Sequence, residues 1–311
     1  MPVGGFSGTT LNDLVEKTYW SLMSNQSEVV AKLGSSYTTG AGTLSLTNPF
    51  INTITVGSKL ACSTTDFRVD AWTPNGNNSG GTAAVTVVDG STDQNLSANA
   101  DVFINPKYTR WQIAVAINEA LAILSSPTNG LYQVGETTIT YNPVYSGYDL
   151  GAVPANFTAV LELTADHPYP DRNFIRVRRY DVVRGVTSAK FPSGRGLILK
   201  EFKYTFPGFN LNMAYGDPFT PLQALTDDVV TTGGLPSTAI DLPPLLAEAL
   251  LTEGREIKRN FIENQPDPRK ALDVPPGAVL ASTNKLDVRI ERRISEERDR
   301  LDNIWPHQRR F

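Results

Sequence analysis

Residues 102–120 read VFINPKYTRWQIAVAINEA, and the hydrophobic period of the chain changes within this stretch. The first three residues, Val102–Ile104, form a short β-rich run. Beyond the Asn-Pro pair, the apolar residues recur at helical spacing. The members of that face are Trp111, Ala114, Ile117, Leu121 and Leu124. The stretch therefore predicts the end of a β segment followed directly by a helix over residues 107–125.

Short β-rich runs separated by turns precede this helix. The runs are Thr43–Thr47, Ile51–Val56, Phe67–Trp72, Ala83–Val88 and Val102–Ile104. The clearest turns are rich in Pro, Asn, Gly, Ser and Asp and cover residues 73–81 and 89–93. Five or six short strands at this spacing predict a small β-sandwich or barrel over residues 37–105.

Helical spacing also occurs before the β segment. Leu11, Leu14, Val15, Thr18 and Leu22 share one face. Thr10 with Asp13 resembles a capping box in which Asp replaces the usual Glu. We therefore expect a helix over residues 10–24, with a weaker continuation to Leu33 that Gly34 ends. The β segment is then bracketed by two helices, so we expect it to be an insertion whose ends lie close together.

The rest of the chain alternates between β-rich and helical patterns. Strands are expected at Leu131–Val134, Thr137–Tyr141, Phe157–Leu163, Phe174–Tyr180 and Leu197–Phe206. Residues 207–240 look loop-rich, with one short helix at 219–225. Asp241 is a good N-cap for a helix over 242–262, with two prolines in its first turn. A last helix is expected over 284–303, after the elbow Val274–Gly277.

These elements predict an α+β fold with a helical core. The core would comprise residues 1–36, 106–130 and 240–303. The small β-sandwich or barrel of residues 37–105 would be inserted into it, and residues 131–239 would form a second β-rich region. Residues 304–311 would form an extended C-terminal arm.

The composition favours a structural protein over an enzyme. The 28 Lys and Arg residues are outnumbered by 32 Asp and Glu, which excludes a polycation that coats nucleic acid. One cysteine excludes an internal disulfide framework and a Cys-based zinc cluster, and two histidines argue against a His-rich metal site or a Ser–His or Cys–His triad. We therefore expect no catalytic residue, no cofactor and no metal site. The sequence has no signal-peptide pattern and no apolar stretch that could span a membrane, so we expect a soluble chain or part of a soluble assembly.

The distribution of charge along the chain indicates more about its partners than the net charge does. Thirteen of the 28 basic residues lie between Gly254 and Phe311. The helix over 284–303 interleaves both signs, which suits ion pairs between helices or between subunits. The residues expected at such a subunit interface are Arg289, Glu291, Arg292, Arg293, Glu296, Glu297 and Arg298. The tail after this helix combines Trp305 with Arg309, Arg310 and Phe311, and Trp and Arg are enriched at interface hot spots.

Three parts of the sequence share an order with one family of virion proteins. They are the opening helix Thr10–Tyr19, the stretch Val102–Ala120, and a C-terminal series. That series runs from Leu245–Arg259 through Asp267-Pro-Arg269, Asp273–Ala278, Glu296–Leu301 and Trp305-Pro306. Together they resemble the head-to-tail adaptors (connectors) in the necks of tailed bacteriophages of the siphovirus type. The likeness is greatest to actinobacteriophage virion structural proteins and covers nearly the whole chain.

The resemblance implies a ring subunit of the virion neck, made in the host cytoplasm. Such a ring, usually of twelve copies, sits beneath the portal protein, contacts the next neck or tail-completion protein, and lets genomic DNA pass without sequence-specific binding. No membrane is involved. Carried onto this chain, the portal-docking arm would comprise Trp305, His307, Arg309, Arg310 and Phe311. A weakly acidic chain suits a conduit that must not grip DNA.

Three alternatives stay open. The first is a stopper or tail-completion ring of six copies. The second is a virion-surface or baseplate module that binds a glycan, for which Trp72 is the strongest aromatic candidate. The third is a tail-associated hydrolase that uses Asp166 and His167, although an exposed loop is the simpler interpretation of that pair.

Overall fold

A computed structural model describes residues 8–22, 29–47, 54–75, 80–89, 91, 93–166, 174–186, 188–200, 202, 209–263 and 278–305. This part of the chain contains thirteen strands, four α-helices and a short 3-10 helix, η2 (Ser237–Ala239). It divides into two compact units, each described by itself below. The first comprises residues 1–120, 222–228 and 241–290, and the second comprises residues 121–221, 229–240 and 291–311.

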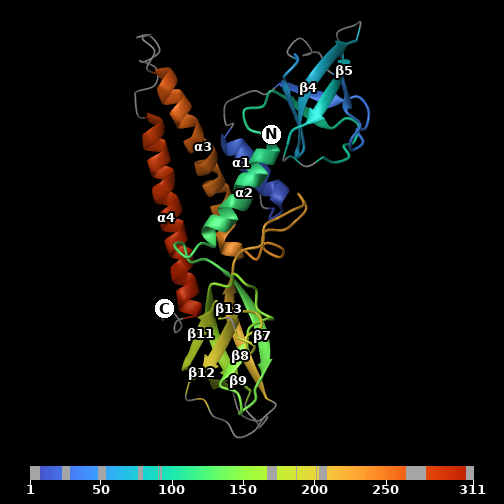
Figure 1. The fold of residues 1–311 in the computed structure, drawn as a ribbon. Coiled ribbons are helices and arrows are strands. Elements are labelled where there is room, and N and C mark those ends of the chain that lie inside the picture. The colour runs from blue at the N-terminus through green and yellow to red at the C-terminus, as the bar shows by residue number, and fades with distance from the viewer. Residues whose placement is uncertain are drawn as a thin grey trace. The chain divides into compact units, whose positions relative to one another are not determined.

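The first unit contains a closed six-stranded barrel (Figure 1). Its strands are β1 (Val29–Leu33), β2 (Thr43–Thr47), β3 (Lys59–Cys62), β4 (Thr65–Pro74), β5 (Gly80–Val87) and β6 (Asp101–Ile104). The order around the barrel is β1-β2-β5-β4-β3-β6, and every pairing is antiparallel. β1 closes the barrel because it pairs with β2 on one side and β6 on the other. Closure leaves no strand edge unpaired.

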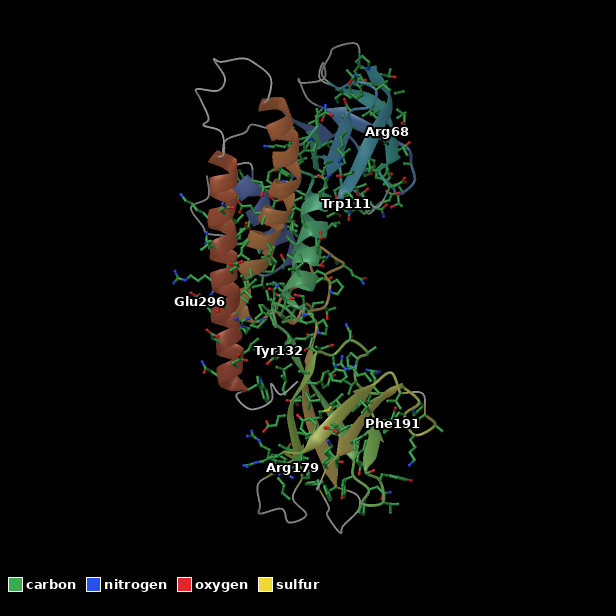
Figure 2. All side chains as sticks on the ribbon, turned by 60° about the vertical axis from the view of Figure 1, so that its left-hand side comes forward. Arg68, Trp111, Tyr132, Arg179, Phe191 and Glu296 are labelled. Atoms are coloured by element: carbon green, nitrogen blue, oxygen red, sulfur yellow. The ribbon has the colours of Figure 1, made fainter. Side chains whose placement is uncertain are left out.

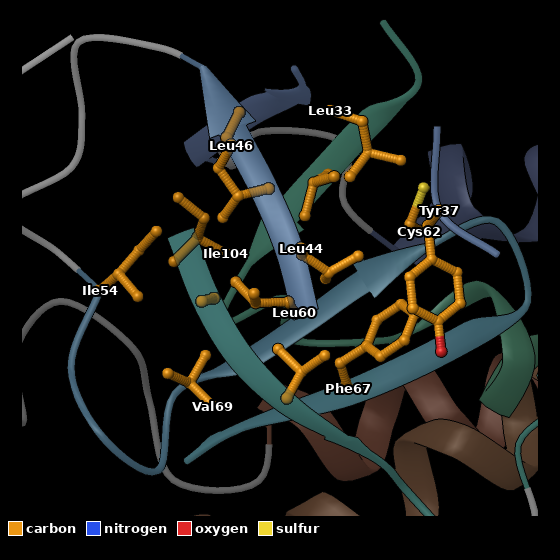
Figure 3. Close-up of a cluster of buried hydrophobic side chains, with 14 of the residues drawn as sticks. Leu33, Tyr37, Leu44, Leu46, Ile54, Leu60, Cys62, Phe67, Val69 and Ile104 are labelled. Atoms are coloured by element: carbon orange, nitrogen blue, oxygen red, sulfur yellow. The ribbon is translucent and has the colours of Figure 1, made fainter. Parts of the chain in front are cut away.

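The barrel interior is filled by alternate residues of each strand, as the period of two requires. Figure 3 shows Leu44, Leu60, Phe67 and Val69 converging from three strands. Tyr37 places the edge of its ring against Phe67, with the ring centroids 5.2 Å apart. The single cysteine of the chain belongs to this core, and burial raises the pKa of its thiol to about 11. It is therefore a packing residue rather than a reactive group.

Helices accompany the barrel in the first unit. They are α1 (Leu11–Leu22), α3 (Leu242–Glu263), and parts of α2 (Arg110–Leu124) and α4 (Ala278–Ile304). The predicted capping box at α1 is confirmed: the Thr10 hydroxyl donates to the Asp13 carboxylate at 2.5 Å, and the Asp13 amide donates back to that hydroxyl at 3.3 Å. A second box begins α2, where Thr109 and Gln112 exchange hydrogen bonds of 3.1 and 3.2 Å. α1 and α3 pack against one another.

The second unit is a sandwich of two antiparallel sheets. Its strands are β7 (Gln133–Thr140), β8 (Gly147–Asp149), β9 (Ala159–Ala165), β10 (Ile175–Arg176), β11 (Tyr180–Arg184), β12 (Arg195–Leu199) and β13 (Asn210–Asp217). One sheet has the order β10-β9-β13-β7 and the other β11-β12-β8. Side chains from both sheets form one buried cluster, which includes Tyr148, Leu163, Leu197 and Met213. The sandwich therefore has a core of its own.

The predicted helical core with an inserted β module is wrong. The described chain is mostly strands, and its two buried clusters of largely β residues lie in the barrel and the sandwich. The predicted continuation of the first helix to Leu33 is instead β1, the strand that closes the barrel. An α+β mixture, the coarser part of the prediction, agrees with the structure.

Other local predictions also need correction. Residues 54–56, expected in a strand, belong to none, and residues 219–225 contain no helix. β3, β8 and β13 were not expected. By contrast, β2 has the predicted bounds, and α3 starts directly after Asp241 as expected. The elbow Val274–Gly277 lies outside the described residues. Within those residues, no helix combines the length and the apolar composition that crossing a bilayer requires.

Candidate surface on helix α4

The C-terminal half of α4 carries most of the predicted interface residues. Its buried stripe follows helical spacing through Ile290, Ile294 and Leu301, as the sequence predicts. Glu297 occupies the same stripe and is only 4% exposed. A carboxylate at such a position must be paired, because burying an unpaired charge is costly.

Both carboxylate oxygens of Glu297 have partners within the second unit. Its Oε2 accepts a hydrogen bond from Arg300 at 2.9 Å and another from the Thr238 hydroxyl at 2.9 Å. Arg293 lies 3.5 Å from its Oε1 and also donates to the carbonyl oxygen of Thr238 at 2.9 Å. These contacts join α4 to Thr238 in η2. Glu297 and Arg293 thus have structural partners inside the chain.

The neighbouring Glu296 is exposed and forms a second ion-pair group (Figure 2). Arg292 contacts it at 2.9 Å and Arg293 at 2.8 Å. Hydrogen bonds from Arg293 and Arg292 hold the pKa of Glu296 below its ordinary value. Because both partners lie on the same helix, this group stabilises the helix locally.

Three of the seven predicted interface residues remain. Arg289 and Glu291 are exposed and Arg298 is half-buried. Across the residues that the structure describes, none of the three forms an ion pair. Arg289 borders a polar hollow of about 320 Å³ in the first unit, together with Lys17, Ser21 and Glu248. Arg298 lies in the second unit and lines a larger pocket.

That pocket has a volume of about 440 Å³ and is lined only by residues of the second unit. Its apolar wall comes from the turn after α2, with Leu131 and Tyr132, and from the start of β9 and the loop before it, with Phe157 and Val160. α4 contributes Arg298 and Asp302, and Trp305, which directly follows the helix, completes the lining on that side. Their spacing of four and then three residues places these three side chains on one helix face.

Arg184 supplies a fixed positive charge to the same pocket. Its guanidinium donates to the carbonyl oxygen of Phe157 at 2.7 Å and stacks over the Phe157 ring, 4.4 Å from the centroid. A largely apolar pocket with a few placed polar groups has the composition of binding sites in general.

The structure places the predicted arm only in part. Trp305 directly follows the end of α4 and is half-buried in the wall of the pocket. His307, Arg309, Arg310 and Phe311 lie outside the described residues. Trp305 was expected in an arm and Arg298 at a subunit interface, and both line one pocket. Their shared helix face was the signal available in the sequence.

The residues of the alternative functions have ordinary surroundings where they are described. Asp166 accepts a hydrogen bond of 2.6 Å from the side-chain amide of Asn212, and His167 lies outside the described residues. Trp72 packs partly buried against the barrel core, with its ring over Gly81. Among the residues with described positions, no three His, Cys, Asp or Glu side chains could together hold a metal ion.

Comparisons with known proteins give no match: no family model fits the chain, and no curated protein is significantly similar to it in sequence.

Proposed function

We propose that this chain is a structural subunit of a bacteriophage neck ring, a head-to-tail adaptor that docks beneath the portal and joins capsid to tail. Two kinds of support converge. The first is the order of the sequence segments that resemble adaptor proteins. The second, which carries the proposal on the structural side, is the division of the α4 charges into paired and unpaired groups.

Some charged side chains of α4 form ion pairs within the chain, and others are left to pair with a neighbouring subunit. Arg293, Glu296 and Glu297 have ion-pair partners inside the chain. Arg289 and Glu291 carry opposite signs on the exposed part of the same helix and have no ion pair within the described residues. In a ring of identical copies, every subunit offers both signs to its neighbours, so such charges can pair between copies.

The net charge of −4 agrees with a ring through which DNA passes. A ring that surrounds passing DNA has to avoid strong phosphate contacts, since each such contact adds to affinity and slows movement. We expect weak DNA binding that vanishes at physiological salt, without sequence preference.

Electron microscopy of the purified chain mixed with the portal protein of the same virus tests the proposal. Added density in a ring on the portal, with twelve copies, is the expected result. A ring that forms only after another neck protein is added, with six copies, would replace the adaptor by a stopper. No added density with either partner would contradict a place in the neck.

A pair of matched variants links the result to α4. Arg289→Glu reverses an exposed charge without an ion pair in the described chain and should prevent ring formation. Arg292→Ala removes another exposed arginine, whose partner, Glu296, lies on the same helix, and it should leave the ring intact. Equal ring formation by both variants would contradict the assignment of this face to a subunit interface.

A further inference from the structure

One end of the sandwich carries the pocket and the other carries a protruding turn. β7 and β9 both begin at the pocket end, since Gly216 of β13 pairs with Val134 and with Ala159. Residues 141–146 follow the far end of β7. Eight residues of strand separate the two ends by about 23 Å. In Figure 2, Tyr132 marks the pocket end of this unit and Arg179 the opposite end.

The turn presents two large apolar side chains to solvent. Val144 is 83% exposed and Tyr145 is 60% exposed. Water covers both side chains in the isolated chain, which is unfavourable for groups of this size. No charged residue occurs between Tyr141 and Tyr148, so the turn itself brings no charge into a contact.

Hydrogen bonds hold the turn in shape. The side-chain oxygen of Asn142 accepts from the Val144 amide at 3.0 Å, and its carbonyl oxygen accepts from the Tyr145 amide at 3.0 Å. The Tyr148 hydroxyl donates to the same carbonyl oxygen at 2.8 Å. A turn that is already ordered loses little conformational entropy when it binds.

The pocket matches this turn chemically. Leu131, Phe157 and Val160 contribute apolar atoms to its lining. Arg298 has no ion pair in the described chain and can stack on an aromatic ring, a contact that strengthens when water is excluded. Trp305 adds a second aromatic surface at the same wall.

We propose that the Val144–Tyr145 turn of one copy inserts into the pocket of the next copy. Because turn and pocket lie at opposite ends of one sandwich, the contact is heterologous, and its repetition gives a ring when the rotation closes. The inference deepens the proposed function and rests on it for the ring. The pairing of turn and pocket can be tested separately.

Cysteine pairs test the contact directly, because the native Cys62 is buried and will not compete. Ser146 is exposed beside Tyr145, so Ser146→Cys chains, which keep Val144 and Tyr145, are mixed with Asp302→Cys chains under mild oxidation. A disulfide-linked dimer should form in the mixture and not with either variant alone, and a chain with both substitutions should give a ladder of oligomers. As a matched control, Val56→Cys, an exposed site on the barrel, should not cross-link to Asp302→Cys.

Sedimentation provides a readout that needs no cross-link. Tyr145→Ala and Arg298→Ala should each weaken self-association at least tenfold, whereas Val56→Ala should not change it. A chain that stays monomeric at millimolar concentration overturns the inference, as does cross-linking of Asp302→Cys to itself at the rate of the mixture. If rings form on the portal but the mixed variants do not cross-link, the contact between turn and pocket is wrong and the proposed function stands. If the mixed variants cross-link but the chain does not bind the portal, the proposed function is wrong and the contact stands.

Discussion

Arg110, the first residue of α2, donates two hydrogen bonds from one edge of its guanidinium to one carboxylate, that of Glu16 in α1. Its Nε donates to Oε1 at 2.6 Å and a terminal nitrogen donates to Oε2 at 3.3 Å. The same guanidinium lies 4.1 Å from the ring centroid of Phe103 in β6 and 4.5 Å from that of Tyr19. One side chain therefore connects two helices and the barrel within the first unit.

Replacing Arg110 by alanine should destabilise this unit by about 2–4 kcal/mol, because it leaves a partly buried carboxylate unpaired and two rings uncovered. Urea unfolding followed by tryptophan fluorescence measures the change, since Trp20, Trp72 and Trp111 all lie in that unit. Arg68→Ala is the matched control: its partner Asp70 lies 3.5 Å away and both side chains are exposed, so the loss should stay below about 0.5 kcal/mol. Equal losses would contradict the role given to Arg110.

Glu296 and Glu297 provide a second contrast, between adjacent residues of one helix. Glu297→Gln should destabilise the second unit by about 2–4 kcal/mol, because Arg300 and Arg293 would lose a buried counter-charge. Glu296→Gln should have little effect, since its pairs are exposed to water. Thermal unfolding of the two variants measures the difference, and a larger loss for Glu296→Gln would contradict the assignment.

Asp66 makes the stability of the barrel depend on pH. Its carboxylate is fully buried, neither oxygen has a hydrogen-bond partner among the residues described, and the Lys59 ammonium lies 3.7 Å away. Burial raises the pKa of Asp66, and the positive charge of Lys59 opposes this with a smaller effect. The folded chain therefore binds a proton more readily than the unfolded chain does.

The contribution of this carboxyl group to stability is complete below its ordinary pKa of about 3.9 and declines as the pH rises through the raised value. Asp66→Asn should remove that decline, so the unfolding free energies of variant and native chain should diverge as the pH rises above about 4, with the variant gaining stability relative to the native chain. Parallel curves for Asp66→Asn and the native chain would contradict the prediction.

Local signals in the sequence were sufficient where the structure is decided locally. The Thr10–Asp13 capping box and the bounds of β2 depend on neighbouring residues, and both were predicted. β1 could not be assigned in this way. Its apolar residues, Val29, Val30 and Leu33, fit a helix face as well as a strand, and pairing with β6, about 70 residues later, decides the outcome.

The candidate site also depends on contacts between distant segments, which the sequence does not reveal. The spacing of Arg298, Asp302 and Trp305 is visible in the sequence, but the opposite wall of the pocket comes from residues 131–132 and 156–161. β13, which supports that wall, alternates Leu211, Met213 and Tyr215, yet the glycines and prolines around it made a loop the natural interpretation. Contacts between segments more than a hundred residues apart leave no periodic trace in either segment.

Two truncations separate the pocket from the residues that follow it. Ending the chain after Trp305 keeps the pocket wall and removes His307, Arg309, Arg310 and Phe311, whereas ending it after Asn303 also removes Trp305. If the removed residues dock on the portal, the chain ending at Trp305 should fold, cross-link through Ser146→Cys and Asp302→Cys, and fail to join portal-containing heads. The chain ending at Asn303 should lose self-association as well, because Trp305 forms part of the pocket. Head attachment is scored by electron microscopy and self-association by sedimentation. Normal attachment of the chain ending at Trp305 would remove these four residues from the portal contact and leave α4 as the surface that has to account for docking.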